Sequence, residues 1–405
     1  MLQKFLLSKS TNGKFRFFEV FTDSEWHEPE HGYIIQRSYG QVGGKTTLSP
    51  PIIVSKTKQN RTWKEQLLLQ FNSEVKKFKD KGAIEVEKHP TEYTLEELNE
   101  LFGNVVTNQF GVIKPMLAKQ ESKVTNRKIF DKEWIASRKI NGVRALFYWD
   151  GKEVKTASRG GIVYDYSTNH IRKNNILIDF FKENPTIILD GELYRHGKSL
   201  QQISGAARME VNAYDCDWLE YYVYDLIKTD ELDLPASKRI ELLQEIGENL
   251  GLGFDPYREW KKDELQMQIV PQVYVSGWNN IKALHDIYVN KGWEGVVIRD
   301  PDKPYKPNGR SNDMIKVKSY LDSTFKVIDY QLGLRGSEDM CFICEMEDGR
   351  TFKAMPLGDR ATKEEYVQNF ETKYKGHLGD CKYFEYSDDG IPCQPKFLAF
   401  RWDLE

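Results

Sequence analysis

The stretch WIASRKINGVR, residues 134–144, places Lys139 between two strand-like runs, with Gly142 three positions after it and Arg144 five positions after it. Glycine in such a place is typical of a tight turn between strands. A lysine becomes a nucleophile when its amine is uncharged, and burial or nearby cations favour the uncharged form. Attack on phosphorus leaves a phosphoramidate, a bond that is labile once its nitrogen is protonated. The stretch therefore predicts a nucleophilic lysine beside a turn, although Lys-x-x-Gly alone also fits an ordinary surface lysine.

Carboxylates and an aromatic side chain follow this stretch in an order that suits nucleotide transfer. Asp190 and Glu192 flank a glycine at the end of an apolar strand, and Glu294 opens another apolar strand. Such carboxylates are suited to a divalent metal. Tyr224 lies in an aromatic strand and is suited to stacking on a base. Each residue alone also fits a salt bridge or a core position, but the ordered set indicates one catalytic site.

Cations that could hold phosphates complete the set. Arg159 lies in a glycine-rich turn, and Arg299 ends the strand that Glu294 opens. Side chains alternate along a strand, so Lys316 and Lys318 point to the same side. Two like charges on one face are destabilising unless an anion lies between them. These lysines fit a phosphate site, and a solvated strand face is the alternative.

Length and composition restrict the class of protein. A chain of 405 residues is long enough for roughly two or three domains. Its 58 basic and 61 acidic residues leave a net charge of −3, so binding to nucleic acid requires local basic stripes. The longest apolar runs, such as residues 145–149, are much shorter than the ~20 residues of a membrane helix, and residues 1–5 do not resemble a secretory signal. Five cysteines suit a reducing compartment, so we expect a soluble cytoplasmic protein without a membrane partner.

Periodicity predicts an α+β multidomain chain. Residues 1–85 combine a hairpin, with a turn at 11–13, and one amphipathic helix; residues 86–112 form a helical linker with a capping box at 94–97. Residues 113–322 alternate strands with occasional helices, near 236–250 and 280–290. Residues 323–405 have short strands near 325–330, 340–346 and 351–355 and one helix near 363–374, which fits a small OB-type barrel. The first helix has an apolar stripe, a candidate N-cap and a candidate stop: Trp63, Leu67, Phe71, Val75 and Phe78, with Asn60 and Gly82.

The motifs from Lys139 to Lys318 resemble those of the covalent nucleotidyltransferases, specifically the ATP-dependent polynucleotide ligases. Residues 114–118, Lys-Pro-Met-Leu-Ala, also resemble the entry strand of that family's adenylation domain. The resemblance covers about residues 113–322 and implies that ATP adenylates Lys139. AMP then passes to a 5′-phosphate, and a 3′-hydroxyl displaces it and seals the nick. The remaining roles that the resemblance implies are nucleotide binding by Ser137, Arg144, Arg159, Glu192, Tyr224, Arg299, Lys316 and Lys318, and binding of Mg²⁺ or Mn²⁺ by Glu192 and Glu294.

Two departures from the family pattern keep alternatives open. Asn141 stands where DNA ligases usually have aspartate, which favours an RNA ligase or a preference for an RNA strand at the nick. Arg401 and Asp403 resemble the C-terminal motif, but Leu404 and Glu405 follow them in place of the motif's lysine. This loss is compatible with a nucleic-acid-binding module without turnover. A capping-type guanylyltransferase that uses GTP would share the lysine chemistry.

Residues 37–43, Arg-Ser-Tyr-Gly-Gln-Val-Gly, resemble a WGR domain in which Tyr39 and Gln41 replace the tryptophan and the arginine. The resemblance implies binding of nucleic acid. Residues 50–82 carry eight basic against three acidic side chains, a stretch suited to tracking phosphates, although a solvated helix face is the alternative. We expect a monomer that clamps a nicked duplex. The predicted nucleic-acid contacts are Arg37, Lys56, Lys58, Arg61 and Lys64.

Cys341 and Cys344 form a C-x-x-C pair, and Cys381 and Cys393 could complete a zinc site. Positions three apart on a strand face opposite sides, which speaks against a shared metal. We therefore favour buried free thiols.

Overall fold

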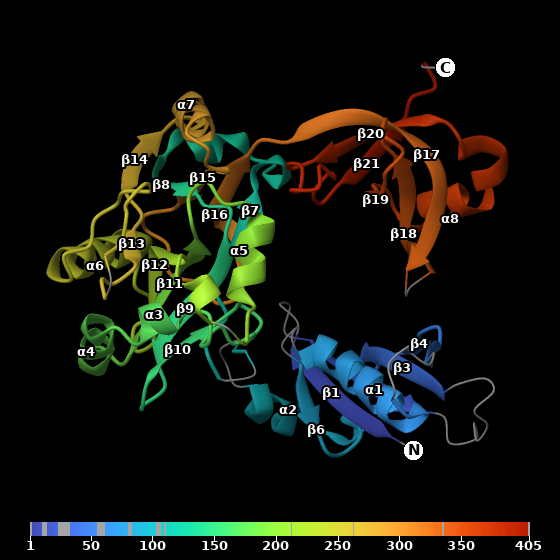
Figure 1. The fold of residues 1–405 in the computed structure, drawn as a ribbon, viewed down its shortest axis with the longest axis horizontal. Helices are drawn as coiled ribbons and strands as arrows, with labels where there is room; N and C mark the ends of the chain where they lie inside the picture. The colour runs from blue at the N-terminus through green and yellow to red at the C-terminus, as the bar shows by residue number, and fades with distance from the viewer. Residues whose placement is uncertain are drawn as a thin grey trace. The chain divides into compact units, whose positions relative to one another are not determined.

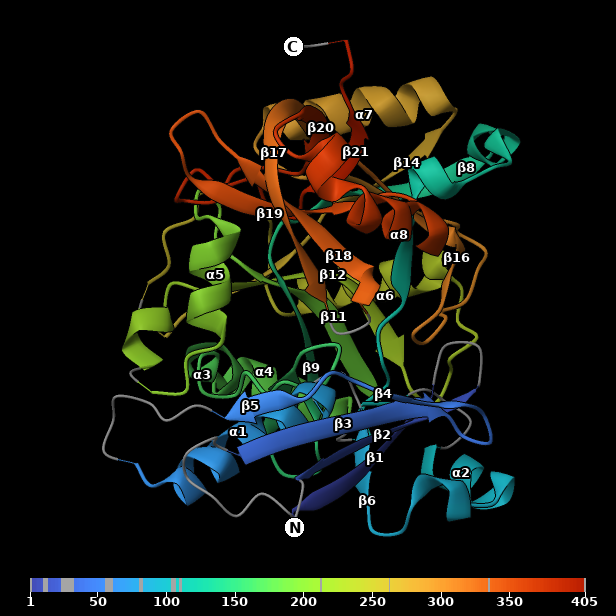
Figure 2. The same ribbon diagram turned by 90° about the vertical axis from the view of Figure 1, so that its right-hand side faces the viewer.

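The computed structural model describes residues 2–9, 14–22, 33–54, 61–79, 83–102, 107–108, 111–211, 213–261, 263–333 and 336–403. The chain forms two compact units, Met1–Lys318 and Ser319–Glu405 (Figures 1 and 2). The predicted turn at 11–13, the helix cap and stop at Asn60 and Gly82, and the predicted contacts Lys56 and Lys58 lie outside the described residues.

The first 86 residues form an antiparallel sheet with one helix packed against it. The sheet order is β4-β3-β2-β1-β6, and β5 also pairs with β3. Helix α1 (Trp63–Lys79) buries Leu67, Phe71 and Val75 in the same apolar cluster as Leu6 of the sheet, which confirms the predicted stripe. The predicted hairpin is the antiparallel pair β1–β2. The strands are β1 (Gln3–Lys9), β2 (Phe15–Thr22), β3 (Tyr33–Gln41), β4 (Thr46–Leu48), β5 (Ile52–Val54) and β6 (Ile84–Val86).

Arg37 is buried, whereas a contact with nucleic acid requires an exposed side chain. Its side chain extends from β3 towards α1, where Nη1 lies 3.0 Å from a carboxylate oxygen of Glu74. Arg37 is 4% exposed and Glu74 is 3% exposed. Charged groups are buried only when they are paired, so Arg37 belongs to a core ion pair and is withdrawn as a phosphate contact. Arg61 and Lys64 are exposed, as such a contact needs.

The capping box at the next helix is present. Helix α2 (Leu95–Phe102) follows Thr94, whose hydroxyl accepts from the backbone N–H of Glu97 at 3.2 Å. The Glu97 carboxylate accepts in turn from the backbone N–H of Thr94 at 2.7 Å. This reciprocal pair satisfies two donors that a helix start leaves free.

Residues 117–318 contain two five-stranded sheets that share one core. Their orders are β10-β9-β11-β12-β13 and β14-β8-β15-β16-β7. Buried Phe147 and Leu189 of the first sheet belong to the same apolar cluster as Trp134 and Ile298 of the second. The strands are β7 (Leu117–Gln120), β8 (Glu133–Lys139), β9 (Val143–Trp149), β10 (Val154–Ala157), β11 (Ile187–Tyr194), β12 (Glu220–Lys228), β13 (Met267–Ile269), β14 (Gln272–Ser276), β15 (Gly295–Arg299) and β16 (Arg310–Lys318).

Five α-helices accompany these sheets in the described part of residues 117–318. Helices α6 (Ala236–Asn249) and α7 (Trp278–Asn290) lie close to their predicted positions, and α6 packs along β12 while α7 packs along β15 (Figure 1). Three short helices, α3 (Asn169–Arg172), α4 (Asn175–Glu183) and α5 (Leu200–Ala207), were not predicted. Among the described helices, none has the length and apolar character that crossing a bilayer requires.

The second unit is a closed barrel with the strand order β17-β18-β19-β21-β20. The one α-helix in the described residues of this unit, α8 (Arg360–Gln368), comes between β19 and β20 in the chain and packs on β18. The helix begins three residues earlier than predicted because the Asp359 side chain accepts from the backbone N–H of Thr362 at 2.9 Å and caps it. A π turn follows it at Phe370–Tyr374. The strands are β17 (Leu321–Gly333), β18 (Gly336–Glu345), β19 (Thr351–Pro356), β20 (Leu378–Tyr383) and β21 (Lys396–Phe400).

The cysteines of this unit are free thiols. Cys344 and Cys381 are buried in the barrel core with their sulfur atoms 3.9 Å apart, whereas Cys341 is only partly buried. In the described ranges, no group of three or more His, Cys, Asp or Glu side chains is placed to hold a metal ion.

Candidate active site

A cavity of about 180 Å³ in the first unit gathers predicted site residues from both central sheets. The strands β8, β15 and β16 of one sheet and β9, β11 and β12 of the other carry all of them except Arg159, which lies in the turn after β10. Because motifs far apart in the chain end at this one cavity, the ordered set of the sequence is a single site in space. The predicted residues that line it are Ser137, Lys139, Arg144, Arg159, Glu192, Tyr224, Arg299 and Lys316.

Lys139, at the end of β8, faces the carboxylate of Glu294. The Lys139 side chain is 18% exposed and forms an ion pair with Glu294, whose side chain is 6% exposed. The Glu294 carboxylate also lies 3.2 Å from Nζ of Lys318, so the phosphate contact of Lys318 stays a prediction. The backbone N–H of Glu294 donates to the Lys139 carbonyl at 3.0 Å, which ties the two residues together.

Two glycines make this arrangement sterically possible. A Cβ atom on Gly142 would lie 2.5 Å from the Leu193 carbonyl oxygen, and one on Gly295 would lie 2.3 Å from the Val317 carbonyl oxygen. Gly295 also has a φ of 148°, which side chains disfavour. These glycines therefore allow the chain at Gly142 to approach β11 closely and the chain at Gly295 to approach β16 closely.

Glu192 lies beside this pair. Its carboxylate accepts from the backbone N–H of Gly142 at 2.8 Å. Burial raises the pKa of Glu192 from 4.5 to about 7; the charge of Lys139 opposes this rise and the charge of Glu294 adds to it. Two carboxylates that repel each other fit a divalent cation, since Mg²⁺ typically takes one or two protein carboxylates and completes its shell with phosphates and water.

The raised pKa of Glu192 makes stability depend on pH. The folded state favours the protonated form, so this contribution is present below pH 4.5 and is lost as pH rises through about 7. In metal-free buffer we expect the free energy of unfolding to fall by about 2 kcal/mol more between about pH 5.5 and about pH 8 than in a Glu192→Gln variant. Urea unfolding of both proteins with a chelator measures the difference. If the free energy of unfolding changed equally with pH in both proteins, Glu192 would not have a raised pKa in the folded state.

Tyr224 lines the same cavity near two guanidinium groups. Its ring centre is 5.7 Å from the Arg144 guanidinium carbon and 5.5 Å from that of Arg299. Arg299 Nη1 donates to the Ser137 hydroxyl at 3.1 Å. Arg144 forms a two-point contact with Asp190, with Nε 2.8 Å from Oδ1. The cavity therefore has a fixed aromatic wall, but the charge of Arg144 is already paired.

A second hollow, of about 710 Å³, continues from this cavity and shares Arg144, Arg159 and Arg310 with it. Lys114 and Arg208 also line it. Partial burial, with the charges of Arg144 and Arg310, lowers the pKa of Arg159. Burial is the larger cause of this shift, and the nearby charges of Arg144 and Arg310 make the hollow cationic, which favours an anion such as a phosphate.

Lys316 and Arg310 belong to this cationic region. Burial and then the charges of Lys139 and Lys318 lower the pKa of Lys316, so the two strand lysines are near each other as predicted. Arg310 was missed by the motif search. It begins β16, and a register shift between Ser311 and Ile315 interrupts the alternation of side chains along this strand, so the spacing from Lys316 gave no signal for it.

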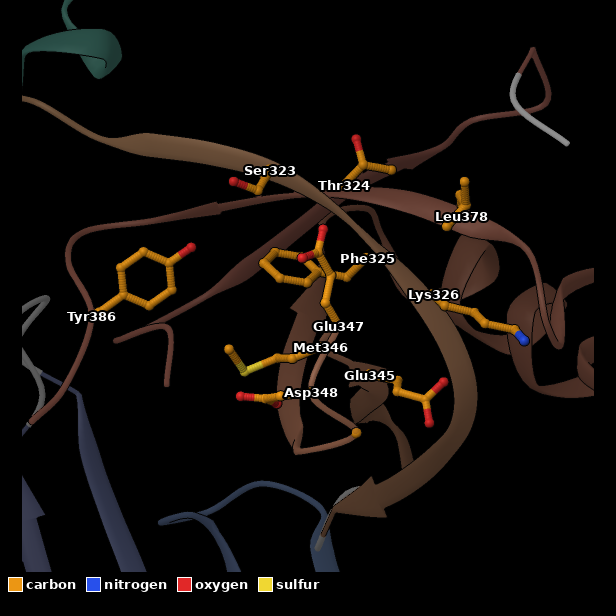
Figure 3. Close-up of a pocket in the computed structure, with 11 residues that line it drawn as sticks. Ser323, Thr324, Phe325, Lys326, Glu345, Met346, Glu347, Asp348, Leu378 and Tyr386 are labelled. Atoms are coloured by element: carbon orange, nitrogen blue, oxygen red, sulfur yellow. The ribbon is translucent and has the colours of Figure 1, made fainter. Parts of the chain in front are cut away.

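The barrel unit has a hollow of about 800 Å³ that is lined by acidic side chains, in contrast to the cationic cavity around Lys139. Figure 3 shows the carboxylates of Glu345, Glu347 and Asp348 around the apolar side chains of Phe325 and Met346. Carboxylates repel phosphates, so the smaller cavity around Lys139 is the better nucleotide site although its volume is less.

The packed sheets and the lysine at their junction define a nucleotidyltransferase. Residues 115–318 match the family model described as the ATP dependent DNA ligase domain, and the chain belongs to this family. The DNA ligase of African swine fever virus (isolate Pig/Kenya/KEN-50/1950) is 28% identical over 311 residues, which cover 72% of this chain and 69% of the viral protein. The DNA ligase of Archaeoglobus fulgidus is 27% identical over 259 residues, 60% of this chain and 42% of that protein.

Solved structures share the fold. The structure named Pmar-Lig_Pre has a TM-score of 0.61 at 20% identity, covering 77% of this chain and 73% of that chain. A structure from work on Lig E DNA ligases has a TM-score of 0.52 at 19% identity, covering 72% of this chain and all of that chain.

Proposed function

We propose that the chain seals nicks between a 5′-phosphate and a 3′-hydroxyl in duplex DNA, with ATP as the source of the adenylate. The observation that carries this proposal is the position of Lys139, partly buried against Glu294 at a cationic cavity. The cavity lies within the residues that match the ATP-dependent DNA ligase family.

The reaction has three displacements at phosphorus. Lys139 Nζ attacks the α-phosphorus of ATP, so a P–N bond forms and pyrophosphate leaves. The 5′-phosphate of the nick then attacks the same phosphorus, which breaks the P–N bond and moves AMP to the DNA. The 3′-hydroxyl finally attacks the 5′-phosphate, and AMP leaves. In this proposal Arg159, Lys316 and Arg310, which line the cavity, neutralise charge during these steps.

The nucleotide is held at both ends in this proposal. Tyr224 stacks on adenine, and the backbone of Ser137 meets the edge of the base. Arg299 supports both residues through its contacts with the ring and the hydroxyl. Lys318 assists at the α-phosphate from its position beside Glu294.

Glu192 and Glu294 would hold a divalent metal, Mg²⁺ or Mn²⁺. The fit rests on their mutual repulsion, which contributes to the raised pKa of Glu192. When bound, the metal supplies positive charge to the phosphate oxygens.

We propose the finer division of the chain as WGR-like residues 1–85, a helical linker at 86–112, an adenylation domain at 113–322 and an OB-type domain at 323–405. The closed five-stranded barrel with one inserted helix supports the last of these. The exposed Arg61 and Lys64 support a nucleic-acid contact by the first. In this proposal the protein acts as a monomer that closes around the duplex.

A preference for RNA at the nick is the second candidate, because Asn141 lacks the charge of the usual aspartate. Discrimination would rest on the 2′-hydroxyl. A panel of nicked duplexes with DNA or RNA on each side separates the two candidates. Equal sealing of all combinations would remove the RNA preference.

Denaturing gels after incubation with labelled ATP and Mg²⁺ test the adenylation step directly. We expect AMP to remain on the protein, and labelled GTP to give much less adduct. An active preparation that seals nicks without ever retaining AMP would contradict the proposal.

A further inference from the structure

Arg138, the residue directly before Lys139, lies among aromatic rings. Its guanidinium carbon is 4.2 Å from the ring centre of Phe254, 5.2 Å from that of Tyr288 and 5.3 Å from that of Trp293. We name these three rings the aromatic cage. Since neighbouring residues on a strand point to opposite faces, Arg138 enters the cage while Lys139 faces the cavity.

The guanidinium has no carboxylate partner within the described part of the chain, and its buried Nε has no hydrogen-bond partner there. Its charge is therefore stabilised by the faces of aromatic rings, which attract cations. An arginine that is held in this way needs no additional carboxylate near Lys139. Such a carboxylate would compete with Glu192 and Glu294 for the lysine and for cations.

The cage also holds the segment that carries Glu294. Trp293 is 5% exposed and directly precedes Glu294, just as Arg138 directly precedes Lys139. Gly295 pairs with Lys139 in the register of β15 and β8. Two neighbouring residues of β8 therefore contact two neighbouring residues of the segment just before β15: Arg138 contacts Trp293, and Lys139 contacts Glu294.

The rings of the cage come from separate segments and contact one another and His196, which leaves them little freedom. His196, from the segment after β11, packs on Trp293 with ring centres 4.6 Å apart. Phe254 contacts the same tryptophan with ring centres 5.9 Å apart. Tyr288 comes from the last turn of α7 and is 6% exposed. Because the Arg138 side chain is packed against rings from several segments, its position in β8 is fixed, and the position of the next residue, Lys139, is fixed with it.

We propose that Arg138 is a positioning residue for the first chemical step, and that its seat in the aromatic cage holds Lys139 in line with the nucleotide and opposite Glu294. This inference rests on the proposed function, because it concerns the adenylation of Lys139. Arg138 acts through the strand and makes no contact with ATP in this role.

Single-turnover adduct formation at several ATP concentrations tests this role with Arg138→Met, which keeps the length of the side chain but removes the charge and the planar group. We expect the rate at saturating ATP to fall by about 10- to 100-fold, the scale expected for a small misplacement of a reacting group. The ATP concentration that gives half the maximal rate should change by less than about twofold, since the groups that bind ATP are untouched. Arg138→Lys should recover part of the rate because it restores a cation to the cage.

A second variant keeps the inference testable if Arg138→Met does not fold. Phe254→Leu removes the nearest ring, leaves Arg138 in place and should slow adduct formation several-fold at unchanged half-saturating ATP. Wild-type rates in the folded Arg138 or Phe254 variants would overturn the inference, as would a loss of ATP binding equal to the loss of rate. A wild-type protein that forms no adduct would instead overturn the proposed function.

Discussion

A protein with Lys139→Arg should retain no labelled AMP after denaturation. Arginine keeps a positive charge next to Glu294, so the ion pair that orders the site persists. The guanidinium stays protonated at any working pH and has no free electron pair for attack on phosphorus. We expect adduct formation to fall by at least about 10⁴-fold, the scale seen when a covalent nucleophile is removed. Quantitative gel analysis over a long incubation measures the residual rate.

Two controls test whether the loss of adduct formation comes from removal of the nucleophile itself. Lys128→Arg makes the same substitution at an exposed lysine and should leave the rate unchanged. A nick supplied with AMP already on its 5′-phosphate bypasses the first two displacements, so Lys139→Arg should still seal it. Retention of AMP by Lys139→Arg would assign the nucleophile to another residue.

The sequence predicted the site residues that combine a reactive or charged side chain with a clear position on a predicted strand. Lys139, Glu192, Tyr224 and Lys316 each stand at a strand position that the alternation of side chains defines, and the structure brings all four to one cavity. The hairpin β1–β2 and helix α1 also follow from local periodicity.

The remaining features depend on partners that are distant in the sequence. Arg37 was predicted as a nucleic-acid contact from the WGR-like stretch at 37–43, and its partner in the core, Glu74, lies 37 positions away, where no local pattern points to it. Arg144 looked free until its two-point contact with Asp190 was visible. Helix α4 has nine residues, too few for several turns of apolar repeat to stand out. Periodicity reports which face of an element is apolar, but it does not report which charged side chains meet there.

Asp225→Asn should be the most destabilising conservative substitution near the site. Asp225 is 1% exposed and accepts from Arg239 through two bonds, of 2.8 Å and 3.2 Å. Arg299 Nε lies 3.3 Å from the same carboxylate. Burial alone would raise the pKa of Asp225, but the charges of Arg239 and Arg299 outweigh burial and lower it. Removing this one negative charge leaves two buried cations unpaired, a change that typically costs about 3–5 kcal/mol.

The same substitution should weaken ATP binding, because Arg299 loses the anion that holds it against Tyr224 and Ser137. Urea unfolding measures the stability, and the ATP dependence of adduct formation measures the binding. Asp233→Asn, at an exposed position a few residues later in the chain, is the matched control and should change neither. Combining Asp225→Asn with Arg239→Met should recover part of the stability, since only one cation then remains unpaired, but it should not restore ATP binding, because Arg299 is still without its anion. The contrary outcome is a double variant that regains both stability and ATP binding. In that case the binding defect of Asp225→Asn would come from general loss of stability, and Arg299 would not connect the buried charges to the nucleotide site.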